Sequence, residues 1–162
     1  MSAVRNQISG SEYRRVLGHL PTGVTVLTAF LPDSSPTGMA ANSVTSVSLD
    51  PPMILVCPAK ASTTWPPIRE AGQFCVNFMA SHHADLSVRF AQRNVDRFAG
   101  VKWHPRPAGP ALDDAIAWLQ CQIFDEHDAG DHTVVIAEVV DIEASPEGAP
   151  LVFFKGKYGT FS

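Results

Sequence analysis

From Ala115 to Asp125, two kinds of side chain alternate at every second position of the sequence. Because successive side chains of a β-strand point to opposite faces of a sheet, a period of two predicts a strand. The smaller and aliphatic side chains would share one face and the larger or polar ones the other: Ala117, Leu119, Cys121 and Ile123 against Trp118, Gln120, Gln122 and Phe124. This segment is the clearest strand in the chain.

Further segments of strand length follow one another, separated by turns rich in Pro, Gly, Asp and Ser. They cover residues 24–30, 38–49, 53–57, 74–79, 132–143 and 151–154. Short helices are predicted at 9–20, with Ser11 as N-cap, at 65–72 and at 82–92. Because the strands do not strictly alternate with helices, the pattern favours a mainly β fold, an antiparallel barrel with a few helices. We expect one domain spanning residues 1–162.

The low share of charged residues and the negative net charge indicate which partners the protein has. Charged residues make up 17% of the chain and apolar residues 45%, which is little charge for a fully solvated surface and favours a homodimer. The net charge of −4 and the absence of a long Lys/Arg run argue against nucleic acid or an anionic membrane as the main partner.

The cysteines and the absence of a targeting segment indicate the cellular compartment of the protein. Cys57, Cys75 and Cys121 are odd in number, far apart and set in apolar strand-like segments, which predicts buried free thiols and a reducing compartment. No stretch has the length and apolar character of a signal peptide or of a membrane span. We therefore expect a soluble, unprocessed, cytoplasmic protein.

The segment Gly38–Pro52 combines small residues with uncharged polar ones. Small side chains from Gly38 to Ala41 allow a flat ring to approach the main chain, and Asn42 and Ser43 begin a series of amide and hydroxyl groups that form hydrogen bonds without charge. Such a surface suits a heterocycle with a polar edge. A strand with a serine-rich solvent face would have the same pattern, so both interpretations stand.

The loop Pro58–Thr64 leads into the predicted helix at 65–72. Its hydroxyl groups and the free N–H groups of a helix N-terminus are a combination that can hold a phosphate. Ser62 or Thr63 can equally serve only as a cap of that helix.

Several kinds of catalytic site are excluded. His82 and His83 are adjacent on a predicted helix, where they would point apart, and His127 and His132 flank a turn without a Cys partner, so we expect no metal site. The chain has no Gly-x-Ser-x-Gly nucleophile motif, no Gly-x-Gly-x-x-Gly fingerprint and no Walker loop. A nucleotide cofactor would have to be bound outside a Rossmann crevice.

Seven segments occur in the order seen in one family: Gly38–Pro52, Ile54–Pro58, Phe74–Phe78, Arg89-Phe90, Phe98–Gly100, Gly130–His132 and Leu151–Gly156. The chain resembles the flavin reductase-like family over residues 11–159. The resemblance implies an FMN-binding split β-barrel and an NAD(P)H:flavin oxidoreductase that supplies reduced flavin to a separate monooxygenase. Hydride would pass from nicotinamide C4 to flavin N5, a reaction in which positioning matters and no general base is needed.

The resemblance also implies positions for the ligands. The flavin ring would lie against Pro36, Thr37, Gly38, Met39, Ala40, Asn42 and Ser43. Its phosphate side would be reached by Cys57, Pro58, Ala59, Thr63, Thr64, Arg89 and Phe90. His132, oriented by Asp131, would donate to the nicotinamide amide, and the pyridine nucleotide would be held by Phe153, Phe154, Lys155 and Gly156.

Some alternatives stay open on the sequence. His132 is equally interpretable as a turn histidine at a strand end, and Phe153 or Phe154 as core. The whole chain is compatible with a pyridoxamine-phosphate-oxidase-like flavoenzyme with fixed flavin, or with a non-catalytic flavin- or haem-binding barrel. FMN and FAD, and NADH and NADPH, are not distinguished.

Overall fold

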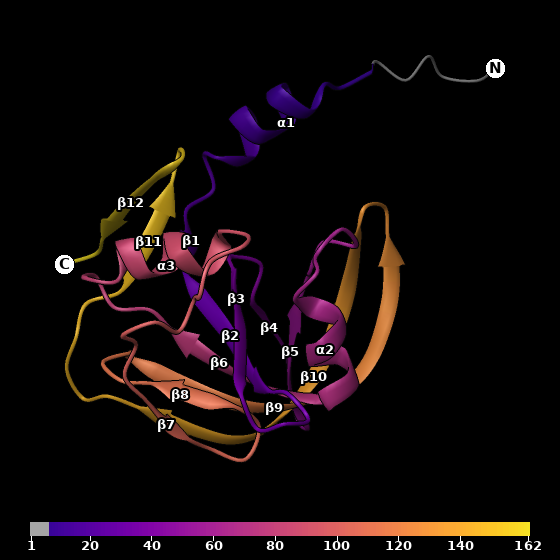
Figure 1. Ribbon diagram of the computed structural model, residues 1–162. Helices are drawn as coiled ribbons and strands as arrows, with labels where there is room; N and C mark the ends of the chain where they lie inside the picture. The colour runs from indigo at the N-terminus through magenta and orange to yellow at the C-terminus, as the bar shows by residue number, and fades with distance from the viewer. Residues whose placement is uncertain (1–6) are drawn as a thin grey trace.

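In the computed structural model, which describes residues 7–162, the largest element is an antiparallel sheet of seven strands (Figure 1). The strands lie in the order β3-β2-β6-β9-β10-β5-β4. Their bounds are β2 Thr25–Phe30, β3 Pro36–Ala41, β4 Thr45–Leu49, β5 Pro52–Val56, β6 Gln73–Phe78, β9 Ala117–Ala129 and β10 His132–Ala144. The predicted mainly β, antiparallel fold is confirmed, and the alternating segment at 115–125 forms the first part of the long strand β9.

The sheet curls strongly. Strands β3 and β4 form its two opposite edges, yet only residues 42–44 connect them along the chain. Four Cα–Cα steps span about 15 Å at most, so the two edges must come close at this end of the sheet. The strand predicted over 38–49 is therefore interrupted, because at 42–44 the chain crosses from one edge to the other. The core inside the curl is formed around buried side chains such as Leu27, Val56 and Phe74.

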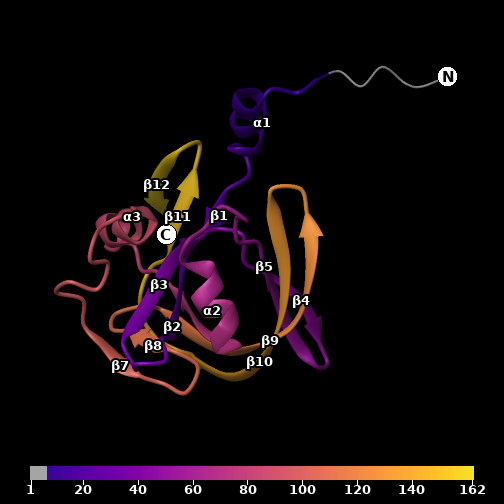
Figure 2. The same cartoon turned by 45° about the vertical axis from the view of Figure 1, so that its right-hand side comes forward.

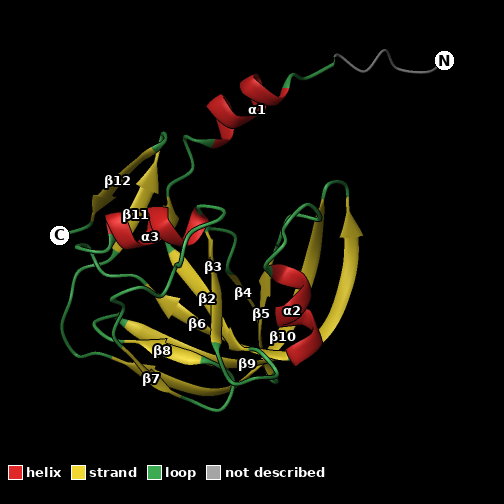
Figure 3. Ribbon diagram, viewed as in Figure 1, coloured by secondary structure: helices red, strands yellow, loops and turns green. Residues whose placement is uncertain are grey.

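Two smaller sheets complete the strands. In one, β1 (Thr22–Gly23), β11 (Leu151–Phe154) and β12 (Lys157–Thr160) pair in the order β1-β11-β12. In the other, β7 (Trp103–Pro105) pairs with β8 (Pro110–Leu112). Figure 3 shows the β11–β12 hairpin rising beside α3, away from the curled sheet.

The described residues contain three short helices, α1 (Gly10–Leu17), α2 (Trp65–Ala71) and α3 (Ala84–Ala91). Helix α2 packs on the sheet through Trp65 and Ile68, both buried. Helix α3 buries Phe90 in a second core cluster with side chains such as Val26 and Leu151. None of these helices is long and apolar enough to cross a membrane.

Helix α1 stands apart from the sheet, as the two views show (Figures 1 and 2). Ser9 and not Ser11 caps it, because the Ser9 Oγ accepts the N–H of Glu12 at 3.2 Å. None of its residues is buried, and Tyr13, Val16 and Leu17 are exposed. An amphipathic helix with an uncovered apolar side is typical of a surface that a partner covers.

Two of the three cysteines are buried as predicted. Cys75 and Cys121 have no exposed surface, and burial raises the pKa of each thiol to about 12. All three cysteines are free. Cys57 differs from the prediction, because it is only half-buried and lines a pocket described below.

The prediction that His82 and His83 point apart is wrong. Both precede α3, with His83 as its N-cap, and their ring centroids lie 4.1 Å apart. The Nδ1 of His83 accepts the N–H of Ala80 at 3.0 Å. Burial lowers the pKa of His83, the neighbouring His82 lowers it further, and Asp114 opposes the shift. Among residues 7–162 no group of His, Cys, Asp or Glu is placed to hold a metal ion.

We expect the protein to lose stability as the pH falls below about 6.5, the ordinary histidine pKa. In the unfolded chain His83 takes up a proton near that pKa, whereas in the folded protein its pKa is lower. The contribution of neutral His83 to the free energy of unfolding is therefore fully present above about pH 6.5 and is lost as the pH falls toward the pKa of the folded state. In thermal unfolding from pH 8 to pH 5, His83→Asn, which keeps an acceptor for Ala80 N–H and does not titrate, should lose less stability than the wild type. Equal slopes would contradict this role.

Candidate functional site

A pocket of ≈ 520 Å³, which we call the edge pocket, lies where the two edges of the curled sheet approach each other. Its lining comes from β2, β3, the 42–44 crossing, β5 and the loop after it, α3, β10 and β12. These residues are Leu27, Met39, Ala40, Ala41, Asn42, Ser43, Val56, Cys57, Pro58, Ala59, Ala91, His132 and Tyr158. The tertiary structure thus joins segments from most of the chain around one cavity.

The edge pocket offers uncharged hydrogen-bonding groups. Strand β3 is an edge strand that pairs only with β2, so its outer side offers backbone groups to a ligand, apart from the carbonyl oxygen of Gly38, which accepts from Arg97. No hydrogen bond within the described residues engages the side-chain amide of Asn42. Ser43 Oγ accepts the N–H of Cys57 at 3.0 Å and thereby ties the crossing to the end of β5.

His132 enters the edge pocket from the start of β10. Its Nδ1 lies 2.7 Å from Oδ1 of Asp131, and this hydrogen bond is the main reason why the pKa of Asp131 is below its ordinary value. The Lys60 N–H donates to the backbone oxygen of Asp131 at 2.9 Å, which fixes the turn. Because a carboxylate only accepts, the Nδ1 carries the proton, and Nε2 of the neutral ring is then an acceptor.

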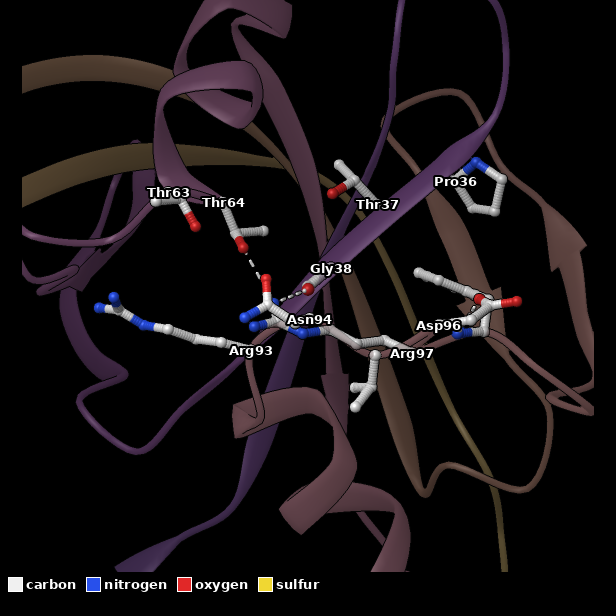
Figure 4. A pocket seen from close by; sticks show the side chains of 11 residues that line it. Pro36, Thr37, Gly38, Thr63, Thr64, Arg93, Asn94, Asp96 and Arg97 are labelled. Atoms are coloured by element: carbon white, nitrogen blue, oxygen red, sulfur yellow. Dashed lines mark hydrogen bonds between the residues drawn. The ribbon is translucent and has the colours of Figure 1, made fainter.

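A second pocket of ≈ 440 Å³, which we call the arginine pocket, lies at β3 (Figure 4). Gly38 lines the arginine pocket, and the next residue, Met39, lines the edge pocket. The lining of the arginine pocket is Pro36, Thr37, Gly38, Thr63, Thr64, Arg93, Asn94, Val95, Asp96, Arg97 and Phe98. Hydroxyl groups and two arginines make this a surface for an anion.

Arg97 holds the arginine pocket together. Its Nη1 donates to the carbonyl oxygen of Gly38 at 2.8 Å and to Oγ1 of Thr64 at 2.9 Å, while Nε and Nη2 donate to the carbonyl oxygen of Gln92. Burial lowers the pKa of the Arg97 guanidinium, and the charge of Arg93 lowers it further. Sequence reasoning missed both arginines, because the segment 92–98 has no regular secondary structure and no period to mark it.

The structure brings most of the predicted flavin residues together. Each pocket takes residues from both predicted groups: the edge pocket takes four ring residues and the phosphate-side loop 57–59, and the arginine pocket takes three ring residues and two phosphate-side threonines. The first set is Met39, Ala40, Asn42, Ser43, Cys57, Pro58 and Ala59, and the second is Pro36, Thr37, Gly38, Thr63 and Thr64.

Arg89 and Phe90 line neither pocket. Arg89 donates through Nη1 to the carbonyl oxygen of Ala99. Phe90 is fully buried and packs edge-on against Phe98, with ring centroids 5.1 Å apart. A Cβ added to Gly38 would lie 3.0 Å from the Phe90 ring, so Phe90 supports β3 from the core side and does not face a ligand.

The segment predicted to hold the pyridine nucleotide also lies outside both pockets. Phe153 and Phe154 belong to β11, and Lys155 and Gly156 form the turn of the hairpin, outside both pockets. Their neighbour Tyr158, on β12, reaches the edge pocket instead, and its ring lies 5.2 Å from that of Phe153. Phe153 therefore packs behind Tyr158, in keeping with the alternative that placed it in the core.

Ser62 is a cap. Its Oγ accepts the N–H groups of Thr64 at 3.2 Å and of Trp65 at 3.1 Å. These donors at the start of α2 are therefore already paired, and the anion-binding character of the loop rests on Thr63, Thr64 and the arginines.

The comparisons with known proteins agree over nearly the whole chain. A family model described as the flavin reductase like domain matches residues 17–162. The reductase subunit HsaB of a flavin-dependent monooxygenase from Mycobacterium tuberculosis is 39% identical, over 94% of this chain and 82% of that protein. The FMN reductase (NADH) SmoA of Agrobacterium fabrum is 41% identical, over 93% of this chain and 85% of that protein.

A solved structure has the same fold. The NADH:FAD oxidoreductase SgcE6 of Streptomyces globisporus, in complex with NAD and FAD fragments, superposes with a TM-score of 0.88 at 34% identity, over 94% of this chain and 92% of that one. Together with the match of the family model, these likenesses show that the chain belongs to the flavin reductase like family.

Proposed function

We propose that the edge pocket holds the isoalloxazine ring of a flavin and that the chain acts as an NAD(P)H-dependent flavin reductase. Bound flavin supplies the chemistry, accepting at N5 the hydride from C4 of the nicotinamide. The observation that carries this proposal is the joining of an uncharged pocket on a free strand edge with an arginine-lined pocket next to it. The family relationship supports the same activity.

The residues present fit a flavin. No Asp, Glu, Lys or Arg lines the edge pocket, so a large planar ring is not required to face a buried charge. Asn42 and the outer edge of β3 supply hydrogen bonds to its polar rim. Thr63, Thr64 and Arg97 line the arginine pocket, which begins at Gly38, next to Met39 of the edge pocket. The phosphate side of the flavin would lie there.

Within this proposal His132 positions the nicotinamide. Its Nε2 would accept the N–H of the carboxamide, with Asp131 fixing the ring through Nδ1. For the neutral ring this is opposite to the direction implied by the resemblance, because its one N–H proton lies on Nδ1 and is donated to the carboxylate. Tyr158 borders the same space from β12 and would limit how the nicotinamide enters.

The variant His132→Ala should raise the KM for NADH about tenfold, the cost of losing one well-placed hydrogen bond. The Kd of the flavin should change by less than about threefold, since His132 reaches the pocket from the side of β10. Steady-state kinetics with saturating flavin and a separate flavin titration measure the two effects. His127→Ala, an exposed position on β9, is the control. If the Kd of the flavin rose by the same factor as the KM for NADH, a role of His132 in nicotinamide binding would be contradicted.

The proposed activity is tested by NADH oxidation without flavin, with FMN and with FAD. Turnover that requires added flavin and saturates with it is the expected result. Tight stoichiometric flavin without NADH oxidation would instead favour an oxidase of the pyridoxamine-phosphate type, and flavin or haem binding without any turnover a carrier.

Further proposals concern assembly. We propose that the curled sheet is a split β-barrel, supported by the short crossing at 42–44, and that residues 1–162 form one domain. A homodimer would cover apolar side chains that are exposed on α1, β9 and β10, among them Phe124 and Ile142, and light scattering tests its mass. Reduced flavin would pass to a separate monooxygenase in the cytoplasm, where the three free thiols would stay reduced.

A further inference from the structure

The arginine pocket is larger and more cationic than the phosphate of a mononucleotide requires. Its ≈ 440 Å³ lies within the range of about 300–1,000 Å³ that is typical of sites for drug-sized ligands. It contains two guanidinium groups, Arg93 and Arg97, and one carboxylate, Asp96, whose Oδ1 accepts the N–H of Phe98 at 3.2 Å. The lining is therefore left with excess positive charge.

The two arginines differ in how they are held. Every nitrogen of the Arg97 guanidinium donates to protein oxygens, which fixes it as part of the wall. Arg93 has no hydrogen bond and no ion pair in the part of the chain that the structure describes. Figure 4 shows its side chain extended beneath Thr63, with the guanidinium at one end of the pocket. The charge of Arg93 contributes to the lowered pKa of Arg97, so a bound anion would relieve repulsion between them.

The other end of the pocket combines Pro36 with the carboxylate of Asp96. Pro36 lies opposite Arg93 in Figure 4, and Val95, which is 43% exposed, belongs to the same lining. A flat base can lie against such side chains while its phosphate faces the arginines. Gly38 and Met39 are successive residues and face opposite sides of β3, so a ligand that reaches from the edge pocket to the arginine pocket would have to pass round the free edge of this strand.

We propose that the arginine pocket is a subsite for an adenosine 5′-phosphate unit, that this unit is the one of FAD, and that Arg93 binds its phosphate and so makes the chain select FAD over FMN. The inference rests on the proposed function, since it takes the flavin ring to occupy the edge pocket. FMN would leave most of the arginine pocket unfilled. NADH carries the same adenosine phosphate chemistry, so the experiment must separate the two sources.

The first measurement is the Kd of FAD and of FMN in the absence of NADH, by calorimetry or quenching of flavin fluorescence. The wild type should bind FAD at least about tenfold more tightly than FMN. In Arg93→Ala, FAD should weaken about tenfold, as expected for one lost charge-assisted contact, and FMN by less than about threefold. Lys102→Ala removes the same charge at an exposed position outside both pockets and should change neither Kd.

Three results would overturn the proposal. Equal affinity of the wild type for FAD and FMN would remove the selectivity. An equal loss for both flavins in Arg93→Ala would reduce Arg93 to a contact of the proximal phosphate. A raised KM for NADH with FMN as acceptor, with the Kd of FAD unchanged, would assign the adenosine phosphate to the pyridine nucleotide. Because the binding measurements need no turnover, a failure of the reductase activity is seen separately, as absent NADH oxidation with either flavin.

Discussion

The variant Asn77→Leu is expected to destabilise the protein by about 3 kcal/mol or more. Asn77 is fully buried on β6, and its amide joins three strands. Its Nδ2 donates to the carbonyl oxygen of Val26 and to Oγ1 of Thr28, both at 3.0 Å, and its Oδ1 accepts the N–H of Leu112 at 2.8 Å. Leucine leaves these groups buried without their partner, and each such group costs about 1–3 kcal/mol.

Urea unfolding measures this loss. Gln122→Leu makes the same kind of change at an exposed position of β9, and its stability should stay within about 0.5 kcal/mol of the wild type. If the two variants lost similar amounts, the side chain of Asn77 would not be what connects β2, β6 and β8.

The variant Gly109→Ala is expected to cost about 3 kcal/mol, the upper end of the usual range for an overpacked core. An added Cβ would lie 2.7 Å from the carbonyl carbon of Thr28 and 3.0 Å from Cα of Ala29, in the backbone of β2. The main chain of a central strand cannot rotate away as a side chain can. The loop before β8, which Thr28 also holds by donating to the carbonyl oxygen of Pro110, would have to move.

Gly23→Ala is the matched control for this substitution. No heavy atom lies within 4 Å of a Cβ added to Gly23, and the change should leave stability unaltered or raise it by about 0.4–1 kcal/mol. Thermal or urea unfolding of the two alanine variants side by side gives the comparison. A stable Gly109→Ala protein would mean that the loop does not pack on β2 as closely as described.

The sequence by itself determined the strands and the chemical character of the segment Gly38–Ser43. Alternation at 115–125 and the β-branched run at 24–30 are local properties, because side-chain direction repeats every two residues in any extended chain. The small and hydroxyl-bearing residues from Gly38 to Ser43 likewise carry their hydrogen-bonding capacity wherever the chain places them. These features sufficed for a mainly β fold and for the segment Met39–Ser43 of the edge pocket, whereas Cys57, Pro58, Ala59 and His132 were implied by the family resemblance.

The tertiary structure alone decided which side chains meet. The curl of the sheet brings its two edges together at 42–44, where the edge pocket lies, and the arginine pocket begins at Gly38, one residue before Met39 of the edge pocket. Packing under β3 buries Phe90, and the register of the β11–β12 hairpin sets Tyr158 opposite Phe153, so that Tyr158 lines the edge pocket while Phe154 and Lys155 lie outside it. Arg93 and Arg97 lie in an irregular segment, whose path is set by distant contacts and leaves no periodic pattern in the sequence.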